Sequence, residues 1–143
     1  MSISNDTTEF YDSIAKFYPY FYRDWETQLQ REGLGLRTIF RNRGVLRVLD
    51  AACGAGTQAV PLAQLGFEVD AVDPSPGMLR KAFETADEYK VRDRIRFHRA
   101  DFDYLPEVVK PPFDAVVCKG NSLPHLLTDA EIETAILTFY SLL

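Results

Sequence analysis

Three aspartates, Asp50, Asp73 and Asp101, each follow a short segment that is predicted to be a β-strand. Directly after the first of them comes a small-residue turn that contains Gly54 and Gly56. In open parallel sheets, ligands bind outside the carboxyl ends of the strands. The two glycines would let the backbone approach a ligand closely. We therefore expect a binding site that combines the carboxylates with the glycine turn.

The glycine turn is compatible with two kinds of nucleoside ligand. Residues 54–59 satisfy the pattern G-x-G-x-x-A, and Asp73 follows at about the spacing of a ribose-binding acid in nicotinamide dinucleotide sites. Asp50, however, would lie beside the two phosphates of a dinucleotide. S-adenosylmethionine carries a sulfonium and an ammonium and no phosphate, so that carboxylate would stabilise it. The residues favour the cationic ligand, with an NAD-binding oxidoreductase as the alternative.

Four segments in order resemble the motifs of class I S-adenosylmethionine-dependent methyltransferases. They are residues 48–56 (VLDAACGAG), 72–79 (VDPSPGML), 99–102 (RADF) and 113–126 (FDAVVCKGNSLPHL). The Gly-Asn-Ser-x-x-His-Leu portion of the fourth is similar to glycine and sarcosine N-methyltransferases and related small-molecule enzymes. The resemblance implies transfer of a methyl group from S-adenosylmethionine to a small molecule, an amine such as glycine or sarcosine, with S-adenosylhomocysteine as the product.

The resemblance also implies a set of cofactor-binding residues. Asp73 would bind both hydroxyls of the ribose, and Asp101 would accept a hydrogen bond from the adenine amine. Met78 would pack on the adenine or, alternatively, be a core residue of its helix. Lys119 would contribute its backbone carbonyl, so its side chain would not be needed. The set implied by the motifs is Asp50, Ala52, Gly54, Gly56, Asp73, Met78, Asp101, Phe102 and Lys119.

On the acceptor side, the fourth motif implies roles for Asn121 and His125. The asparagine would face the methyl acceptor, and the histidine would approach the methionine end of the cofactor. Each also has a structural alternative, Asn121 in a loop turn and His125 as a hydrogen-bonded residue beside a helix. No nucleophile or metal is needed, because the sulfonium is already an activated methyl donor. Alignment of the two reactants can supply roughly 7–11 kcal/mol of the barrier.

The sequence divides into two parts. Residues 1–43 are rich in aromatic side chains and are predicted to form an amino-terminal helical arm or lid, and residues 44–143 a Rossmann-like core that binds S-adenosylmethionine. A lid of this kind could close over a ligand. Arg31 would bind a carboxylate of the methionine or of the acceptor. The predicted lid contacts are Tyr11, Tyr18, Trp25 and Arg31.

Strand-like and helix-like segments alternate in the core, which predicts an α/β fold with a parallel sheet and flanking helices. Pro61 conflicts with the first of the helices, because an interior proline bends or shortens a helix. The expected strands are 45–49, 67–72, 95–100 and 113–118, and the expected helices are 57–65, 78–89 and one that Thr128 caps.

Class I methyltransferases continue beyond the last predicted helix with three further strands, so the resemblance implies that carboxyl-terminal strands are missing here. The chain would then be part of a longer protein or be completed by an oligomer partner. Val116 and Val117 would form an exposed apolar edge that could pair with another chain. A module that binds S-adenosylmethionine without turnover is therefore a second hypothesis.

The composition argues against several other classes. The 143 residues include 16 Lys and Arg against 21 Asp and Glu, so no basic field would attract nucleic acid or an anionic membrane. No apolar stretch approaches the roughly 18 residues of a membrane span, and the first residues do not form a signal peptide. Cys53 and Cys118 have no metal-ligand spacing. We expect a soluble cytoplasmic protein without a metal.

Overall fold

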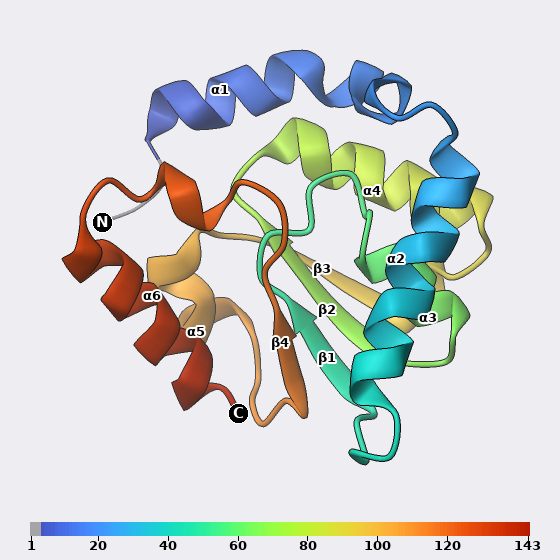
Figure 1. Cartoon of the computed structure of the whole chain (residues 1–143). Coiled ribbons are helices and arrows are strands. Elements are labelled where there is room, and N and C mark those ends of the chain that lie inside the picture. Colours follow the sequence, from blue (N-terminus) through green and yellow to red (C-terminus); the bar gives the residue numbers. More distant parts are fainter. Residues whose placement is uncertain (1–3) are drawn as a thin grey trace.

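A computed structural model describes residues 4–143 and contains a four-stranded parallel sheet (Figure 1). The order of the strands across the sheet is β3-β2-β1-β4. The predicted α/β fold with a parallel sheet is confirmed. The strands are β1 (Arg47–Asp50), β2 (Glu68–Asp73), β3 (Ile95–Arg99) and β4 (Ala115–Val117).

Helices cover both faces of the sheet, and Figure 1 shows α2 and α3 on one side and α5 and α6 on the other. Helix α1 lies across the carboxyl ends of the strands, beside α4. The α-helices are α1 (Asn5–Ile14), α2 (Trp25–Phe40), α3 (Ala59–Gln64), α4 (Pro76–Glu88), α5 (Leu105–Val108) and α6 (Asp129–Ser141). The 3-10 segments are η1 (Ala15–Phe21), η2 (Arg92–Arg94), η3 (Phe102–Tyr104) and η4 (Leu123–His125).

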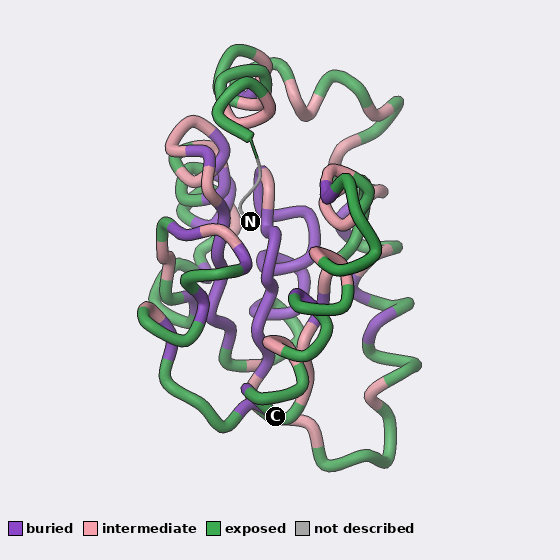
Figure 2. The backbone as a smooth tube through the Cα atoms, turned by 90° about the vertical axis from the view of Figure 1, so that its left-hand side faces the viewer, coloured by how far each residue is buried: buried purple, intermediate pink, exposed green. Residues whose placement is uncertain are grey.

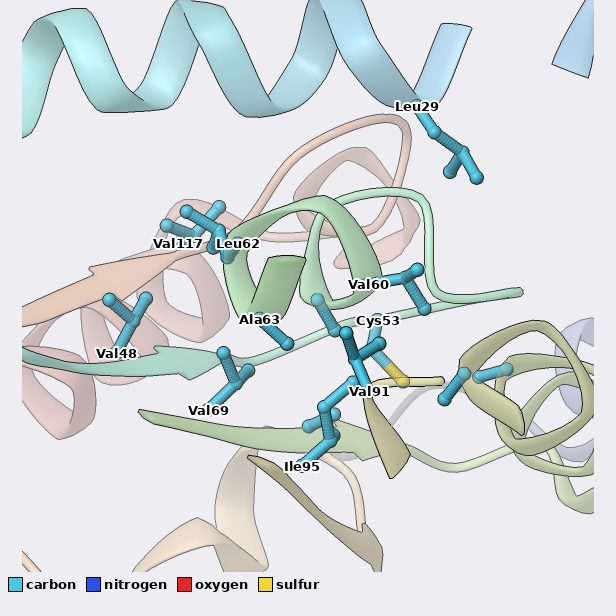
Figure 3. Close-up of a cluster of buried hydrophobic side chains, with 14 of the residues drawn as sticks. Leu29, Val48, Cys53, Val60, Leu62, Ala63, Val69, Val91, Ile95 and Val117 are labelled. Atoms are coloured by element: carbon cyan, nitrogen blue, oxygen red, sulfur yellow. The ribbon is translucent and has the colours of Figure 1, made fainter. Parts of the chain in front are cut away.

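The strands separate two apolar cores, because successive side chains of a strand point to opposite faces. Val48 belongs to the core beneath α2, α3 and α4, and the next residue, Leu49, belongs to the core beneath α5 and α6. Figure 3 shows the first core, in which Leu29 of α2 and Leu62 of α3 lie on the same side as Val69 of β2. Figure 2 shows buried residues along the middle of the molecule and exposed ones on the outer helices.

Helix α3 is shorter than the predicted 57–65, and the position of Pro61 within it explains why the helix tolerates a proline. The proline is the third residue of the helix. The first amides of a helix have no partner within it, so a proline in the first turn removes no hydrogen bond. Gly66 follows the helix with a φ of +97°, which is the left-handed conformation that commonly ends helices.

The helix-capping predictions are confirmed. Ser75 accepts a hydrogen bond from the amide of Met78, and Pro76 is the first residue of α4, two residues before the predicted start. Thr128 and Glu131 form a capping box at the start of α6. The observed strands differ from the predicted ones by at most two residues at their ends, because apolar composition does not mark where the pairing begins.

The prediction that β4 is an edge strand is correct, but the prediction that its valines are exposed is wrong. β4 is an edge strand, but Val117 is buried, and Val116 packs against the core beneath α6. The exposed apolar side chains near this edge belong to α6 itself, where Ile136, Leu137 and Tyr140 are each more than half exposed. Within residues 4–143, none of the helices combines the length and apolar character needed to cross a membrane.

A charged cluster lies on the α5–α6 face of the sheet. Asp70 of β2 accepts hydrogen bonds from Arg47 of β1 and from Arg96 and His98 of β3. Burial alone would raise the pKa of Asp70, but these three partners outweigh it and hold the pKa at about 2. Its carboxylate therefore joins three neighbouring strands.

Candidate functional site

A cavity of about 290 Å³ opens at the carboxyl ends of β1, β2 and β4. The chain reaches β2 and β3 on one side of β1 and then crosses back to place β4 on the other, which makes this the point where the strand order reverses. Ligands of open α/β sheets bind at such points. The lining residues are Thr8, Tyr11, Tyr18, Tyr22, Gln28, Glu32, Ala52, Cys53, Gly54, Thr57, Gln58, Asp73, Pro74, Ser75, Met78, Lys119, Gly120, Asn121, Ser122 and His125.

Asp73 joins the end of β2 to the glycine turn. Its two carboxylate oxygens accept hydrogen bonds from the amide of Gly54 at 2.8 Å and from the amide of Ser75 at 2.9 Å. Burial raises the pKa of Asp73 to about 6, although both amides favour the charged form. The cavity floor thus carries a carboxylate whose position is fixed on both sides.

Asp50 lies beneath the turn and does not line the cavity. It is fully buried, and within residues 4–143 neither carboxylate oxygen has a well-formed hydrogen bond, although the backbone amides of Ala52 and Ala59 lie near enough to favour its charged form. Burial, followed by the nearby charge of Asp73, raises the pKa of Asp50 to about 7. Its proximity to Asp73 makes this end of the cavity unfavourable for an anion.

The two glycines of the turn have different roles. A Cβ added to Gly54 would meet nothing within 4 Å, so this residue opens toward the cavity. Gly56 does not line the cavity, and its Cβ would lie 3.0 Å from Val60 and 3.4 Å from Ala82. With a φ of +88°, Gly56 serves the packing of the turn against α3 and α4 rather than contact with a ligand.

The predicted adenine-side residues lie apart from the main cavity. Asp101 lines a neighbouring hollow, which meets the main cavity at Thr8 and Pro74. Phe102 is buried, and its ring packs edge-on against Phe139 in the core beneath α6. The motif thus places Asp101, but not the ring of Phe102, in the lining of a hollow, with Oδ1 of Asp101 buried.

The aromatic arm forms the roof of the cavity. The hydroxyl of Tyr11 lies 3.0 Å from Nε2 of His125, and the two rings meet edge-on with centroids 5.6 Å apart. Tyr18 lines the cavity and packs against the small cluster that contains Met78. Met78 itself is buried and also lines the cavity. Trp25 does not line the cavity and packs behind Tyr18 and Tyr22.

Asp12 is a residue of the site that sequence reasoning missed. Its carboxylate accepts hydrogen bonds from the hydroxyl of Ser75 and the amide of Gly77, at the first turn of α4. A Cβ on Gly77 would lie 2.8 Å from Oδ1 of Asp12, so only glycine admits this approach. The contact holds α1 over the cavity.

Glu32 and Gln28 of α2 are also part of the lining that was missed, whereas Arg31 lies outside it. Arg31 lines an outer hollow that shares Glu32 and Lys119 with the main cavity. Leu29 and Leu36 form the buried stripe of α2, and positions 28 and 32 flank that stripe one turn apart. The helical periodicity therefore contained the signal for these two residues.

The remaining predicted residues meet at the cavity. Ala52 borders it after β1, and Lys119 and Asn121 border it after β4. Cys53 lines it as well, and burial raises the pKa of this thiol well above its usual range, which makes it a poor nucleophile. Of the thirteen positions assigned to the cofactor, seven line the cavity, and an eighth, Asp101, lines the adjoining hollow. The seven are Ala52, Gly54, Asp73, Met78, Lys119, Tyr11 and Tyr18.

Comparisons of the sequence and of the structure with known proteins all find methyltransferases. A family model described as a methyltransferase domain matches residues 48–143. The glycine/sarcosine/dimethylglycine N-methyltransferase of Actinopolyspora halophila is 38% identical over 120 residues, 84% of this chain and 21% of the relative. The glycine/sarcosine N-methyltransferase of Parasynechococcus marenigrum (strain WH8102) is 35% identical over 121 residues, 84% of this chain and 42% of the relative.

Among solved structures, magnesium protoporphyrin IX methyltransferase from Synechocystis PCC 6803 with bound S-adenosylmethionine has a TM-score of 0.66 and 28% identity. The match covers 79% of this chain and 53% of that protein. The chain thus spans less than half the length of the two curated relatives named above.

Proposed function

This chain belongs to the methyltransferase domain family, and from that premise we propose that it is the cofactor-binding part of an S-adenosylmethionine-dependent methyltransferase. The proposed acceptor is a small-molecule amine of the glycine or sarcosine type. The relatives that support this acceptor are named as glycine/sarcosine N-methyltransferases.

The observation that carries the proposal is the carboxylate of Asp73 at the end of β2. Each of its oxygens accepts one backbone hydrogen bond, from Gly54 and from Ser75. A carboxylate can accept about four hydrogen bonds, so one acceptor position remains on each oxygen. Two neighbouring hydroxyls of a ribose would donate to those positions. Loss of these hydrogen bonds would weaken the binding free energy by roughly 1–3 kcal/mol.

The charges around the cavity support a cationic nucleoside over a dinucleotide. Glu32 and Asp73 line the cavity, Lys119 is paired with Glu32, and the carboxylate of Asp50 lies behind the floor. A diphosphate would meet carboxylates at the glycine turn, whereas a sulfonium and an ammonium would be stabilised there. An NAD-binding oxidoreductase is therefore not favoured.

The remaining cofactor contacts follow from the positions of the lining residues. Asp101, in the hollow that adjoins Thr8 and Pro74, would receive the adenine amine. Met78 would contact the ring from the cavity wall, and the backbone at Ala52 and Gly54 would lie along the methionine chain. When bound, S-adenosylmethionine supplies a methyl group activated by the positive sulfur.

The chain's own residues would then position and shield the reactants. Asn121 would hold the acceptor amine, and His125, paired with Tyr11, would close the methionine end. The arm would exclude water from the cavity, while alignment of the amine with the methyl group supplies the rate enhancement. The amine would arrive in its neutral form, because the lining offers no residue that we assign as its base.

The surroundings of the whole protein are also proposed. Two free cysteines support a reducing compartment such as the cytoplasm. The exposed apolar side chains of α6 beside β4 support association at this edge, with further segments of the same protein or with a second copy. The acidic composition supports a small-molecule acceptor rather than nucleic acid.

Thermal unfolding with S-adenosylhomocysteine and with NAD tests the proposal. A ligand at 100 times its dissociation constant stabilises by about 2.7 kcal/mol, so S-adenosylhomocysteine should raise Tm by several degrees. NAD should leave Tm unchanged. Methyl transfer from labelled S-adenosylmethionine to glycine and sarcosine then separates an enzyme from a binding module without turnover. A shift with NAD alone would contradict the proposed cofactor.

A further inference from the structure

A polar cluster joins three distant segments on the α2 side of the cavity. Glu32 of α2 accepts hydrogen bonds from the side-chain amide of Gln28 at 3.1 Å and from that of Gln58 at 3.2 Å. The ammonium of Lys119, which follows β4, forms an ion pair with the same carboxylate. All four residues line the cavity.

The pair presents opposite charges at one place. The side chain of Glu32 is only 15% exposed, whereas that of Lys119 is 46% exposed. Within residues 4–143, Lys119 is the only Lys or Arg that lines the cavity. A ligand carboxylate that enters the cavity therefore has this ammonium as its one permanently charged partner.

The position of the pair matches one end of the proposed ligand. Asp73 is the last residue of β2 and Lys119 follows β4, with β1 between the two strands. Neighbouring strands are about 4.8 Å apart, so the two strand ends lie about 10 Å from each other. A nucleoside whose ribose binds at Asp73 would extend its amino-acid chain across the glycine turn toward Glu32 and Lys119.

We propose that Glu32 and Lys119 together recognise the α-amino and α-carboxylate groups at the methionine end of the cofactor. Glu32 accepts from the ligand ammonium, and Lys119 donates to the ligand carboxylate. Gln58, which now donates to Glu32, supplies a neutral donor beside them. This inference rests on the proposed function, and it gives the side chain of Lys119 a role that the motif alone leaves to its backbone carbonyl.

A purely structural role is the competing explanation. Exposed ion pairs stabilise proteins by about 0–1 kcal/mol, and this one could simply fasten α2 to the loop after β4. The two roles differ in what they do to ligands. A fastening pair affects every ligand of the cavity equally, whereas a recognition pair affects only ligands that carry the amino acid.

The test compares S-adenosylhomocysteine with 5′-methylthioadenosine, which has the nucleoside and the thioether but no amino acid. Isothermal titration calorimetry of the whole chain measures both ligands in the wild type, in Lys119→Met and in Glu32→Gln. Each variant should weaken S-adenosylhomocysteine roughly 10- to 100-fold, the range for hydrogen bonds to charged groups. Binding of 5′-methylthioadenosine should stay within twofold, which also shows that the variants are folded.

Two further variants sharpen the comparison. Lys119→Arg retains the positive charge and should restore most of the affinity for S-adenosylhomocysteine. Lys110→Met removes an exposed lysine outside the cavity and should change neither ligand.

Equal weakening of both ligands, or no weakening of either, would overturn the proposed recognition while S-adenosylhomocysteine still bound the wild type. If the wild type bound neither compound, the proposed function would fail first and this inference with it.

Discussion

Asp73 and Asp50 show how one residue type acquires two environments within a short distance. Asp73 has a hydrogen bond on each oxygen and faces the cavity, whereas Asp50 has neither property. The difference arises because the chain after Asp50 turns over it through the small residues of the glycine turn. The spacing of the motifs predicted both acids, but only the three-dimensional arrangement separates the one that faces a ligand from the one that lies behind it.

Replacement of Asp73 tests the ribose contact. Asp73→Asn keeps the volume and replaces one acceptor oxygen by a donor, so it should weaken S-adenosylhomocysteine binding by about 1–3 kcal/mol or more, since one of the two amides, of Gly54 or of Ser75, also loses its acceptor. Calorimetry measures the change. The matched control is Asp87→Asn on the exposed side of α4, which should bind like the wild type. Unchanged binding by Asp73→Asn would show that the ribose lies elsewhere.

The hydrogen bond between Tyr11 and His125 is the second residue-scale feature open to test. Tyr11→Phe keeps the ring contact and removes the hydroxyl, so it should lower the stability by about 0.5–1.5 kcal/mol. Amide hydrogen exchange in α1 should be faster in Tyr11→Phe than in the wild type, and this increase should be larger in α1 than in the strands. Tyr20→Phe, at a position 83% exposed, is the control and should leave both measurements unchanged. Equal exchange of α1 in Tyr11→Phe and the wild type would mean that this bond does not hold the roof.

At the scale of elements, α2 and α3 approach so closely that the side chain at one position of α2 decides the packing. A Cβ on Gly33 would lie 2.8 Å from Cβ of Pro61 and 3.3 Å from Leu65. Two residues later, a Cβ on Gly35 would meet nothing within 4 Å. The same substitution within one helix should therefore have opposite effects.

Gly33→Ala should destabilise the chain by about 1–3 kcal/mol, because the added methyl group forces the two helices apart. Gly35→Ala should stabilise it by about 0.4–1 kcal/mol, because alanine has less freedom to lose on folding and its methyl group has room. Chemical denaturation of the two variants measures both effects. A stabilised Gly33→Ala would show that α2 can shift away from Pro61 at little cost.

Local signals predicted the core elements well because their chemistry is local. Ser75 and Thr128 cap their helices through residues three positions away, and Gly66 ends α3 through its own conformation. Of the four arm residues predicted as lid contacts, Tyr11 and Tyr18 line the cavity, whereas Trp25 and Arg31 do not. Asp12 and Glu32 reach partners that lie between 26 and 87 residues away, and local sequence patterns do not indicate which distant residues a side chain will meet.

At the scale of the whole molecule, the two site carboxylates couple stability to pH. The pKa values of Asp50 and Asp73 are raised to about 7 and about 6, against about 4 in an unfolded chain. Between about pH 4 and pH 7 the folded state therefore binds more protons than the unfolded state. The free energy of unfolding contributed by these groups falls as pH rises through this window.

The ligand-free chain should consequently melt at a lower temperature at pH 8 than at pH 5. Asp50→Asn should flatten this dependence and raise the stability at pH 8 by at least about 1 kcal/mol, or about 2–4 °C in Tm. Asp70 does not interfere, because its contribution is complete above about pH 4 and is lost as pH falls through about 2. Asp87→Asn should retain the wild-type pH profile, and a profile equally steep in Asp50→Asn would contradict the assignment.

The roof and the floor of the cavity belong to different stretches of the chain. The family match begins at residue 48, whereas Thr8, Tyr11, Tyr18, Tyr22, Gln28 and Glu32 all precede it. A fragment that began at residue 48 would keep Asp73 and the glycine turn, but both would be exposed to solvent because the roof residues would be missing. Such a fragment would also lack Leu29 and Leu36 of α2, which belong to the core that covers α3. The first 40 or so residues thus supply the shelter from solvent together with Glu32, whereas the carboxylate proposed to bind the ribose belongs to the matched segment.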